Sequence, residues 1–404
     1  MCPLRFLFSS IIVHHNSSDA GTTHKFSDLF ETHCNTHIHQ SVKMKAAFQS
    51  LLTFTSLALL PECHASTVPS LSGTSIDITS GKNGTYPRAT ILSDSSILAS
   101  YASTLSNGNK QLTLSKSSDQ GKTWSNIGTA ATRNASTSDL DNAFPIQLRS
   151  GRILLAYRNH DVDPETKLAT YFRITISYSD DEGIDWNYLS TPAENVACPS
   201  PNKCGIWEPF LRVAKDGSTL QLYYSKENSD VDQDSLMRSS SDGGETWSEA
   251  KTISGENVTA RDGMVGVSEV GGDGKLIAVF ETTEDGNFLI DEVVSEDDGG
   301  TWEARRRVYT PTGENTNAGA PQVVNLGGNL VVSFMTDEDT QQDNWVQGAA
   351  AKLVTSGDGG ETWSNNFQVS EPQANWPGML TLDDDSFLYL VDHLGAKAQK
   401  VVLS

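Results

Sequence analysis

The sequence predicts an all-β protein, a six-bladed β-propeller, and three observations lead to this prediction. Five eight-residue segments repeat the pattern Ser-x-Asp-x-Gly-x-Thr-Trp, and they end at Trp124, Trp186, Trp247, Trp302 and Trp363. The intervals between these tryptophans are 62, 61, 55 and 61 residues, which indicates a repeat architecture. Short strand-like segments separated by turns fill the intervals, and six such units begin in a similar way.

Each position of the repeat has a physical role. The glycine allows a backbone angle that a Cβ atom would forbid, so the chain can reverse sharply. The Ser and Asp side chains bond to the backbone of the turn, and the Trp packs a large apolar face beneath it. One copy departs from the pattern, because Asp185 stands where the others have Thr. The pattern resembles the Asp-box of sialidases and other β-propellers, where it joins the two outer strands of a blade.

The four strands of a blade can be placed in order along the chain. In the first blade they are expected at residues 87–92, 97–102, 111–115 and 124–128, and the same order recurs four more times. The sixth unit has only three strands, at residues 379–382, 387–391 and 397–403. A spare strand precedes the first blade at residues 74–79, and we expect its residues 75–79 to pair with 397–403. The N-terminal strand would thus complete the last blade and close the ring, which protects the sheet edges.

The first 65 residues are expected to lie outside the folded domain. Residues 1–43 resemble an upstream extension, and residues 44–65 have a basic start, an apolar centre and a small final residue, as a secretory signal peptide does. The apolar part is too short to span a membrane. The segment 33–39 is rich in His and Cys and could be read as a metal site, but no core-forming pattern surrounds it. We therefore predict a secreted protein whose single domain is 66–404.

The charge of the chain restricts its partners. The net charge is −22, and it does not change when the first 65 residues are removed. This surface argues against nucleic acid or an anionic membrane as a partner and suits a neutral polymer or a soluble sugar. Residues 66–404 show no metal-ligand spacing, so we expect no metal and no cofactor. We also expect a monomer.

Two sets of equivalent positions are predicted at one axial face of the propeller. The first strands begin at Tyr86, Phe144, Glu208, Gly263, Ala320 and Trp376. Five of these six residues directly precede a proline, and Gly263 is the exception. The second strands reach the same face at Ala102, Arg158, Ser225, Glu281, Met335 and Asp392.

Glu208 and Glu281 are the only glutamates among these twelve positions, and they belong to neighbouring blades. Each follows a large aromatic residue, Trp207 or Phe280. Two carboxyl groups that face each other across a sugar are the minimum for glycoside hydrolysis, and a dry setting raises the pKa of the one that acts as acid. The competing interpretation is that they are ordinary solvated acids, since the chain contains 51 acidic residues. Their shared position and aromatic neighbours favour catalysis.

Further residues at this face are predicted to orient a substrate. The predicted substrate-binding residues are Tyr86, Arg88, Arg158, Trp207, Asp262 and Trp376. An aromatic ring such as Trp376 could stack on a sugar, whereas Trp207 could equally belong to the core. Cys198 and Cys204 are predicted to form a disulfide, because two nearby cysteines of a secreted chain usually pair. The disulfide would brace either a Pro-rich loop alone or a wall of the active site.

Five motifs together give a specific resemblance. They are Gly84-Thr85-Tyr86-Pro87-Arg88, Tyr157-Arg158-Asn159-His160, Trp207-Glu208-Pro209-Phe210, Arg261-Asp262-Gly263-Met264 and Asn317-Ala318-Gly319-Ala320-Pro321-Gln322. With them the chain resembles glycoside hydrolase family 93 over residues 70–404. The resemblance implies a secreted exo-α-1,5-L-arabinanase that releases arabinobiose from linear arabinan with retention of configuration. It also implies that Glu208 and Glu281 are catalytic, with Glu208 favoured as nucleophile and Glu281 as acid/base.

Two alternatives belong to other functional classes. A sialidase would share the boxes and the number of blades, but it needs three arginines for the substrate carboxylate, and no third one falls in a convincing position. A sugar-binding lectin usually repeats one pocket around the propeller, whereas the axial residues of this chain differ from blade to blade. A single asymmetric site therefore favours an enzyme.

Overall fold

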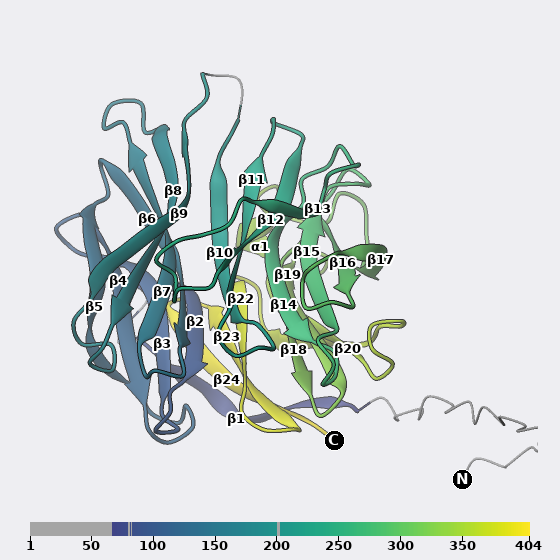
Figure 1. Cartoon of the computed structure of the whole chain (residues 1–404). Coiled ribbons are helices and arrows are strands. Elements are labelled where there is room, and N and C mark those ends of the chain that lie inside the picture. Colours follow the sequence, from purple (N-terminus) through teal and green to yellow (C-terminus); the bar gives the residue numbers. More distant parts are fainter. Residues whose placement is uncertain (1–66, 80, 82, 200–202) are drawn as a thin grey trace, which may run out of the picture. The chain divides into compact units, whose positions relative to one another are not determined.

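The computed structural model describes residues 67–404, except residues 80, 82 and 200–202. The predicted signal peptide and upstream extension lie outside the described residues, as does the His- and Cys-rich segment 33–39. The described part consists of six four-stranded antiparallel sheets, which are the six predicted blades (Figure 1).

Five of the sheets contain four strands that are consecutive in sequence. The first sheet contains β2 (Thr85–Ile91), β3 (Ile97–Thr104), β4 (Asn109–Ser117) and β5 (Ser125–Asn134). The second contains β6 (Ser138–Gln147), β7 (Ile153–Val162), β8 (Ala169–Ser179) and β9 (Asn187–Val196). The third contains β10 (Ile206–Val213), β11 (Leu220–Glu227), β12 (Gln233–Ser240) and β13 (Lys251–Ser254). The fourth contains β14 (Gly263–Glu269), β15 (Leu276–Thr282), β16 (Leu289–Ser295) and β17 (Glu303–Tyr309). The fifth contains β18 (Ala318–Leu326), β19 (Asn329–Thr336), β20 (Ala350–Ser356) and β21 (Ser364–Ser370).

The sixth sheet joins the two ends of the described chain. Its strands are β22 (Asn375–Thr381), β23 (Ser386–Asp392), β24 (Ala396–Leu403) and, at the outer edge, β1 (Pro69–Asp77). The pairing of β1 with β24 runs from Pro69 opposite Leu403 to Asp77 opposite Lys397. The strand is longer than predicted and begins earlier, and its register shifts between Ser72 and Ile76. The strand β1 therefore supplies the fourth strand of the last blade, for which the C-terminal part of the sequence has only three.

The ring is held together by apolar contacts between neighbouring sheets. Each first strand contacts the first strands of the two adjacent sheets, so the cycle of contacts is closed. The second strands are buried along almost their whole length, as β15 and β19 show, because sheets pack on both of their faces. Within the described residues the only helix is the single turn α1 (Trp345–Gly348), and no helix there is long and apolar enough to cross a membrane.

The five Asp-boxes lie between the third and fourth strands of the first five sheets. In the first box the Ser117 hydroxyl accepts a hydrogen bond from the N–H of Gly121 at 2.9 Å and donates one to Asp119 at 2.8 Å. Asp119 in turn accepts bonds from the N–H and the hydroxyl of Thr123 at 2.9 and 2.6 Å. In the second box the N–H of Asp185 still donates to Asp181, but the hydroxyl bond is lost with the threonine. One bond of the turn is thus dispensable.

We predict that the closing strand stabilises the fold through its backbone rather than its side chains, most of which are exposed. Deletion of Pro69–Asp77 should lower the free energy of unfolding by several kcal/mol. The strand β24 would stay paired with β23 but would lose its hydrogen bonds to β1 and become an exposed edge. Chemical denaturation measures the change. The control is Leu71→Ser, whose side chain is 45% exposed and which should have little effect. Equal losses in the two variants would contradict this account.

Candidate active site

All six first strands contain a β-bulge at the same place. The pairing with the second strand shifts register there, and in each bulge one residue that is not glycine has a positive φ angle. These residues are Tyr86, Asn142, Glu208, Met264, Ala320 and Trp376, with φ between 38° and 54°. A bulge bends its strand and re-aims a side chain, and positive φ costs energy for such residues. The first strands line the centre of the ring, which we call the axial channel, and the six bulge side chains at one end of it are set by this one repeated backbone feature.

The register corrects two of the predicted first-strand positions. In the second sheet the equivalent residue is Asn142 rather than Phe144, and in the fourth it is Met264 rather than Gly263. The prediction followed the Phe144-Pro145 pair, but this proline lies beyond the bulge. All six second-strand positions are equivalent as predicted, since each pairs with the residue directly before a bulge. The pairs are Thr85–Ala102, Asp141–Arg158, Trp207–Ser225, Gly263–Glu281, Gly319–Met335 and Asn375–Asp392.

Glu208 is the bulge residue of the third sheet and has the lowest φ of the six, 38°. Its side chain is half-buried and lies beside the Ser225 hydroxyl. Burial raises the pKa of this carboxyl to about 8, and the charge of Glu281 acts in the same direction, while Arg158 and Arg261 oppose the shift. A group with such a pKa can hold or release a proton near neutral pH.

Glu281 reaches the same site from β15 of the neighbouring sheet. Its Oε2 accepts a hydrogen bond from the N–H of Ala320 at 2.7 Å. Burial raises the pKa of this carboxyl to about 7, against the Ala320 bond and Arg261, which lower it. Gly319 makes room for the group, because a Cβ atom there would lie 2.6 Å from Glu281 Oε2 and 2.9 Å from the Trp345 ring. The structure thus brings the two predicted catalytic glutamates into one site.

Arg158 and Tyr86 line the same site. Arg158 forms ion pairs with Asp139 at 3.1 Å and with Asp141 at 3.6 Å, and its guanidinium lies 5.9 Å from the centre of the Tyr86 ring. Burial raises the pKa of Tyr86 well above its usual value, with Arg158 opposing and with Asp141, Glu208 and Glu281 adding to the shift. The Tyr86 hydroxyl is therefore a neutral donor among these charges.

The Trp376 ring stacks on Tyr86, with ring centres 4.5 Å apart and planes inclined by 17°. Trp376 is half-buried and can offer part of its surface to a ligand. Arg88 is buried, and its Nη1 donates hydrogen bonds to the carbonyls of Pro87 and Trp376 at 2.9 and 3.0 Å. Arg88, Asn142, Glu208 and Gln322 are the polar residues around a cavity of about 10 Å³, which is room for about one water molecule.

Two predicted substrate-binding residues have structural surroundings instead. Asp262 is 0% exposed, and its two carboxylate oxygens accept bonds from Arg305 at 2.6 and 3.2 Å, so it cannot touch a substrate. Trp207 is packed edge-on against His160 and Phe172, with ring centres 5.2 and 5.5 Å away. Of the two roles weighed for Trp207, packing is the one that these contacts describe.

Three neighbours of the glutamates were not among the predicted site residues. They are Asp141, Arg261 and Trp345. Asp141 could have been found from its place directly before the bulge, once that position was aligned correctly. Trp345 belongs to α1 in a long connection that has no counterpart in the other blades, and no repeat pattern points to it. Arg261 belongs to one of the five motifs of the sequence, but only its neighbour Asp262 was predicted to bind substrate.

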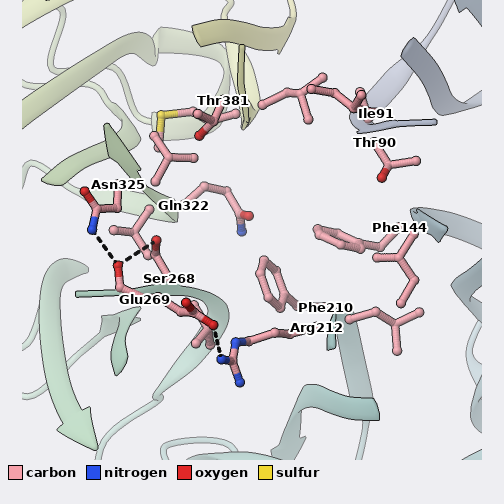
Figure 2. A pocket seen from close by; sticks show the side chains of 18 of the residues that line it. Thr90, Ile91, Phe144, Phe210, Arg212, Ser268, Glu269, Gln322, Asn325 and Thr381 are labelled. Atoms are coloured by element: carbon pink, nitrogen blue, oxygen red, sulfur yellow. Dashed lines mark hydrogen bonds and ion pairs between the residues drawn. The ribbon is translucent and has the colours of Figure 1, made fainter. Parts of the chain in front are cut away.

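The opposite end of the axial channel holds a larger hollow of about 730 Å³, lined by the C-terminal ends of all six first strands. Figure 2 shows Phe144 and Phe210 on one side and the ion pair between Arg212 and Glu269, at 2.6 Å, on another. Arg212 also pairs with Asp298 at 2.7 Å. The acidic and basic side chains that line this hollow neutralise one another, so its chemistry differs from that of the glutamate face.

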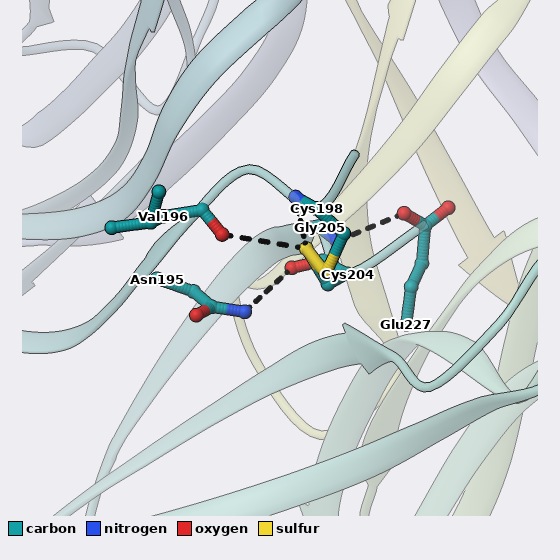
Figure 3. Close-up of a disulfide and its surroundings, with 6 residues drawn as sticks. All are labelled: Asn195, Val196, Cys198, Cys204, Gly205 and Glu227. Atoms are coloured by element: carbon teal, nitrogen blue, oxygen red, sulfur yellow. Dashed lines mark hydrogen bonds between the residues drawn. A yellow bond between two sulfur atoms is a disulfide. The ribbon is translucent and has the colours of Figure 1, made fainter. Parts of the chain in front are cut away.

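The predicted disulfide between Cys198 and Cys204 is present, with Cα atoms 5.8 Å apart. It lies directly before β10, the strand that carries Glu208 (Figure 3). Asn195 donates to the carbonyl of Cys204 at 3.1 Å, and the N–H of Gly205 donates to Glu227 at 2.9 Å. The loop is therefore tied both to β9 of the second blade and to the end of β11 of the third blade.

Comparison with known proteins places the chain among propellers. Residues 89–282 match the BNR repeat-like domain. The α-L-arabinanase of Penicillium chrysogenum, solved with arabinobiose, has a TM-score of 0.63 at 19% identity, over 83% of this chain and 99% of that one. The α-L-arabinofuranosidase of glycoside hydrolase family 93 from Fusarium graminearum, also solved with arabinobiose, has a TM-score of 0.62 at 21% identity, over 84% and 98%.

The likeness is one of fold. The NanB sialidase of Streptococcus pneumoniae shares it too, with a TM-score of 0.54 at 13% identity, over 83% of this chain and 70% of that one. No curated protein matches the chain in sequence. The six-bladed propeller predicted from the sequence is thereby confirmed.

We predict that the two glutamates destabilise the fold at neutral pH. A carboxyl whose pKa is raised on folding contributes most favourably below about pH 4.5, the unfolded value, and this contribution is lost as the pH rises through the folded values of about 7 and 8. Glu208→Gln should therefore raise Tm by a few degrees at pH 8 and leave it unchanged near pH 4. Thermal denaturation at both pH values measures this. Glu165→Gln, at an exposed position, is the control that should change neither value.

Proposed function

We propose that the chain is a secreted, retaining glycoside hydrolase, an exo-α-1,5-L-arabinanase that releases arabinobiose from linear arabinan. The observation that carries the proposal is the pair formed by Glu208 and Glu281, two half-buried carboxyls with raised pKa values at one mouth of the axial channel. Two such carboxyls are what glycoside hydrolysis requires. The arabinobiose bound in two structures of the same fold supports the choice of substrate.

In this mechanism the Glu208 carboxylate attacks the anomeric carbon while Glu281 gives its proton to the leaving oxygen. Water then hydrolyses the glycosyl–enzyme ester, and Glu281 takes the proton back. Glu208 has the higher pKa of the two, about 8 against about 7, because burial outweighs the cations near it. Cations favour Glu208 as nucleophile, because Arg158 and Arg261 both act on its charge, whereas only Arg261 acts on Glu281.

The surroundings of the pair suit a neutral sugar better than a sialic acid. Recognition of a substrate carboxylate needs cations with charge to spare. Arg158 is paired with Asp139 and Asp141, and Arg261 is paired with Glu227 at 2.8 Å. Trp376 offers a partly exposed aromatic surface on which a furanose ring could stack.

Incubation with linear arabinan should release arabinobiose as the main product, measured by chromatography. Replacement of either glutamate by Ala should reduce turnover by roughly 10²-fold or more, because positioned proton transfer and nucleophilic attack are lost. Release of sialic acid from sialosides, with none from arabinan, would show that the substrate assignment is wrong. Near-normal activity in both variants would remove the pair from catalysis.

Azide should separate the two roles. Glu281→Ala with azide should give a glycosyl azide of retained configuration, because azide attacks the intermediate formed on Glu208. Glu208→Ala with azide should give the inverted product by direct attack. NMR of the anomeric centre distinguishes the two. A retained product from Glu208→Ala would mean that the roles are reversed.

A further inference from the structure

An ion pair joins the two blades that carry the glutamates. Glu227 ends β11, the strand paired with the one that carries Glu208, and Arg261 lies two residues before β14, which pairs with the strand of Glu281. Arg261 Nη2 donates to Glu227 Oε1 at 2.8 Å and to Gln233 Oε1 at 2.9 Å. The pair thus connects the third and fourth blades at the end of the channel where the catalytic carboxyls lie.

Glu227 is itself fixed by the disulfide loop. It is only 5% exposed, and its second oxygen accepts the N–H of Gly205 at 2.9 Å. Gly205 directly follows Cys204, and Figure 3 shows the Glu227 carboxylate facing this backbone. Both oxygens of a buried carboxylate are therefore in use, one on the loop and one on Arg261. Such a carboxylate is a rigid anchor, because moving it would leave charge unpaired in the interior.

Arg261 is held from several sides. Its backbone N–H donates to the Thr283 hydroxyl at 2.9 Å, two residues after Glu281, and its Nη1 donates to the Asp230 carbonyl at 3.2 Å. Gly263 lets the chain pass close by, because a Cβ atom there would lie 2.2 Å from Gln233 Nε2 and 3.2 Å from the Ser225 hydroxyl. The guanidinium is thus placed by both blades at once, and its position depends on the spacing between them.

We propose that Glu227 is a positioning residue: anchored to the disulfide loop through Gly205, it holds Arg261 between the third and fourth blades and so fixes the charge and separation of Glu208 and Glu281. The proposal rests on the proposed function of the two glutamates. The other charged or titratable groups near Glu208 and Glu281 are Arg158, Asp141, Tyr86 and, deeper, Arg88. None of these bonds to Glu227 among the contacts of the described residues, so Arg261 is the route by which Glu227 acts.

Glu227→Ala tests the proposal. Arg261 keeps its bonds to Gln233 and to the Asp230 carbonyl but loses its only charged partner among the described residues, so its guanidinium is free to move away from the glutamates. With less of this cation near them, the pKa values of Glu208 and Glu281 rise further. Removal of the Glu227 charge without movement of Arg261 would instead lower both pKa values. The acidic limb of kcat/KM against pH should move to higher pH, and kcat should fall roughly tenfold or more while KM changes less. Glu227→Asp keeps the negative charge, so its pH profile should lie between those of Glu227→Ala and the parent. Loss of both cysteines by Cys198→Ser and Cys204→Ser should shift the limb in the same direction by less.

The matched control is Glu269→Ala. Glu269 also pairs with an arginine of the facing blade, Arg212, but at the opposite end of the same two blades. The Glu269→Ala variant should have a lower Tm, but the acidic limb of its kcat/KM against pH should stay where it is in the parent. A pH profile of Glu227→Ala that matches the parent would overturn the proposal and leave Glu227 as a structural ion pair only. An unchanged profile in the cysteine variant would overturn the link to the disulfide loop.

A readout that needs no activity separates this proposal from the proposed function. Tm should fall between about pH 4.5 and pH 8, and the share of this fall that is due to Glu208 and Glu281 is the share that disappears when both are replaced by Gln. This share should be larger in the Glu227→Ala background than in the parent background. Absence of arabinan hydrolysis would reject the function alone, whereas an equal pair-dependent fall in Tm would reject the role of Glu227.

Discussion

The bulge at the start of each first strand is the constraint on which the site depends. A regular strand would alternate its side chains between the two faces of the blade, and neither face points along the axis. The register shift re-aims one residue per blade at the cost of a positive φ angle. Because the rest of the blade enforces this conformation, the residue at the bulge can differ from blade to blade. Tyr86, Glu208 and Trp376 occupy the same backbone position and do different chemistry.

Charge is handled in two different ways in this molecule. Away from the site, buried acids face arginines directly: Asp262 is 0% exposed and bonds to Arg305, and Glu292 bonds to Arg306 at 2.8 Å. At the site, Glu208 and Glu281 have cations near them but no direct ion pair among the contacts of the described residues, and burial dominates their pKa values. A carboxyl that is not neutralised by a bound arginine keeps both protonation states within reach, which acid/base chemistry requires.

The sequence predicted the blades well because the repeat is a local pattern. Five Asp-boxes and the second-strand positions were placed correctly, since turn chemistry and apolar runs depend on neighbours in sequence. The first strands were harder, because a proline marks the bulge in four blades, while Phe144-Pro145 lies past the bulge and Met264 has no proline after it. Asp262 looked like a site residue because Arg305, its partner, lies 43 residues away and nothing in the sequence pairs them. Trp345 could not be predicted, since it enters from a connection unique to one blade.

The pairing of β1 with β24 also determines when the ring can form. Pro69 and Leu403 lie opposite each other in the ladder, so the last sheet brings together almost the two extremes of the described chain. Contacts of such long sequence separation form late, because the loop-closure entropy must be met before they stabilise anything. During synthesis five blades can assemble while β1 waits without a partner, and β24 offers a bare edge until β1 docks. The time between the completion of β24 and the docking of β1 is therefore when this chain is most exposed to strand-mediated aggregation.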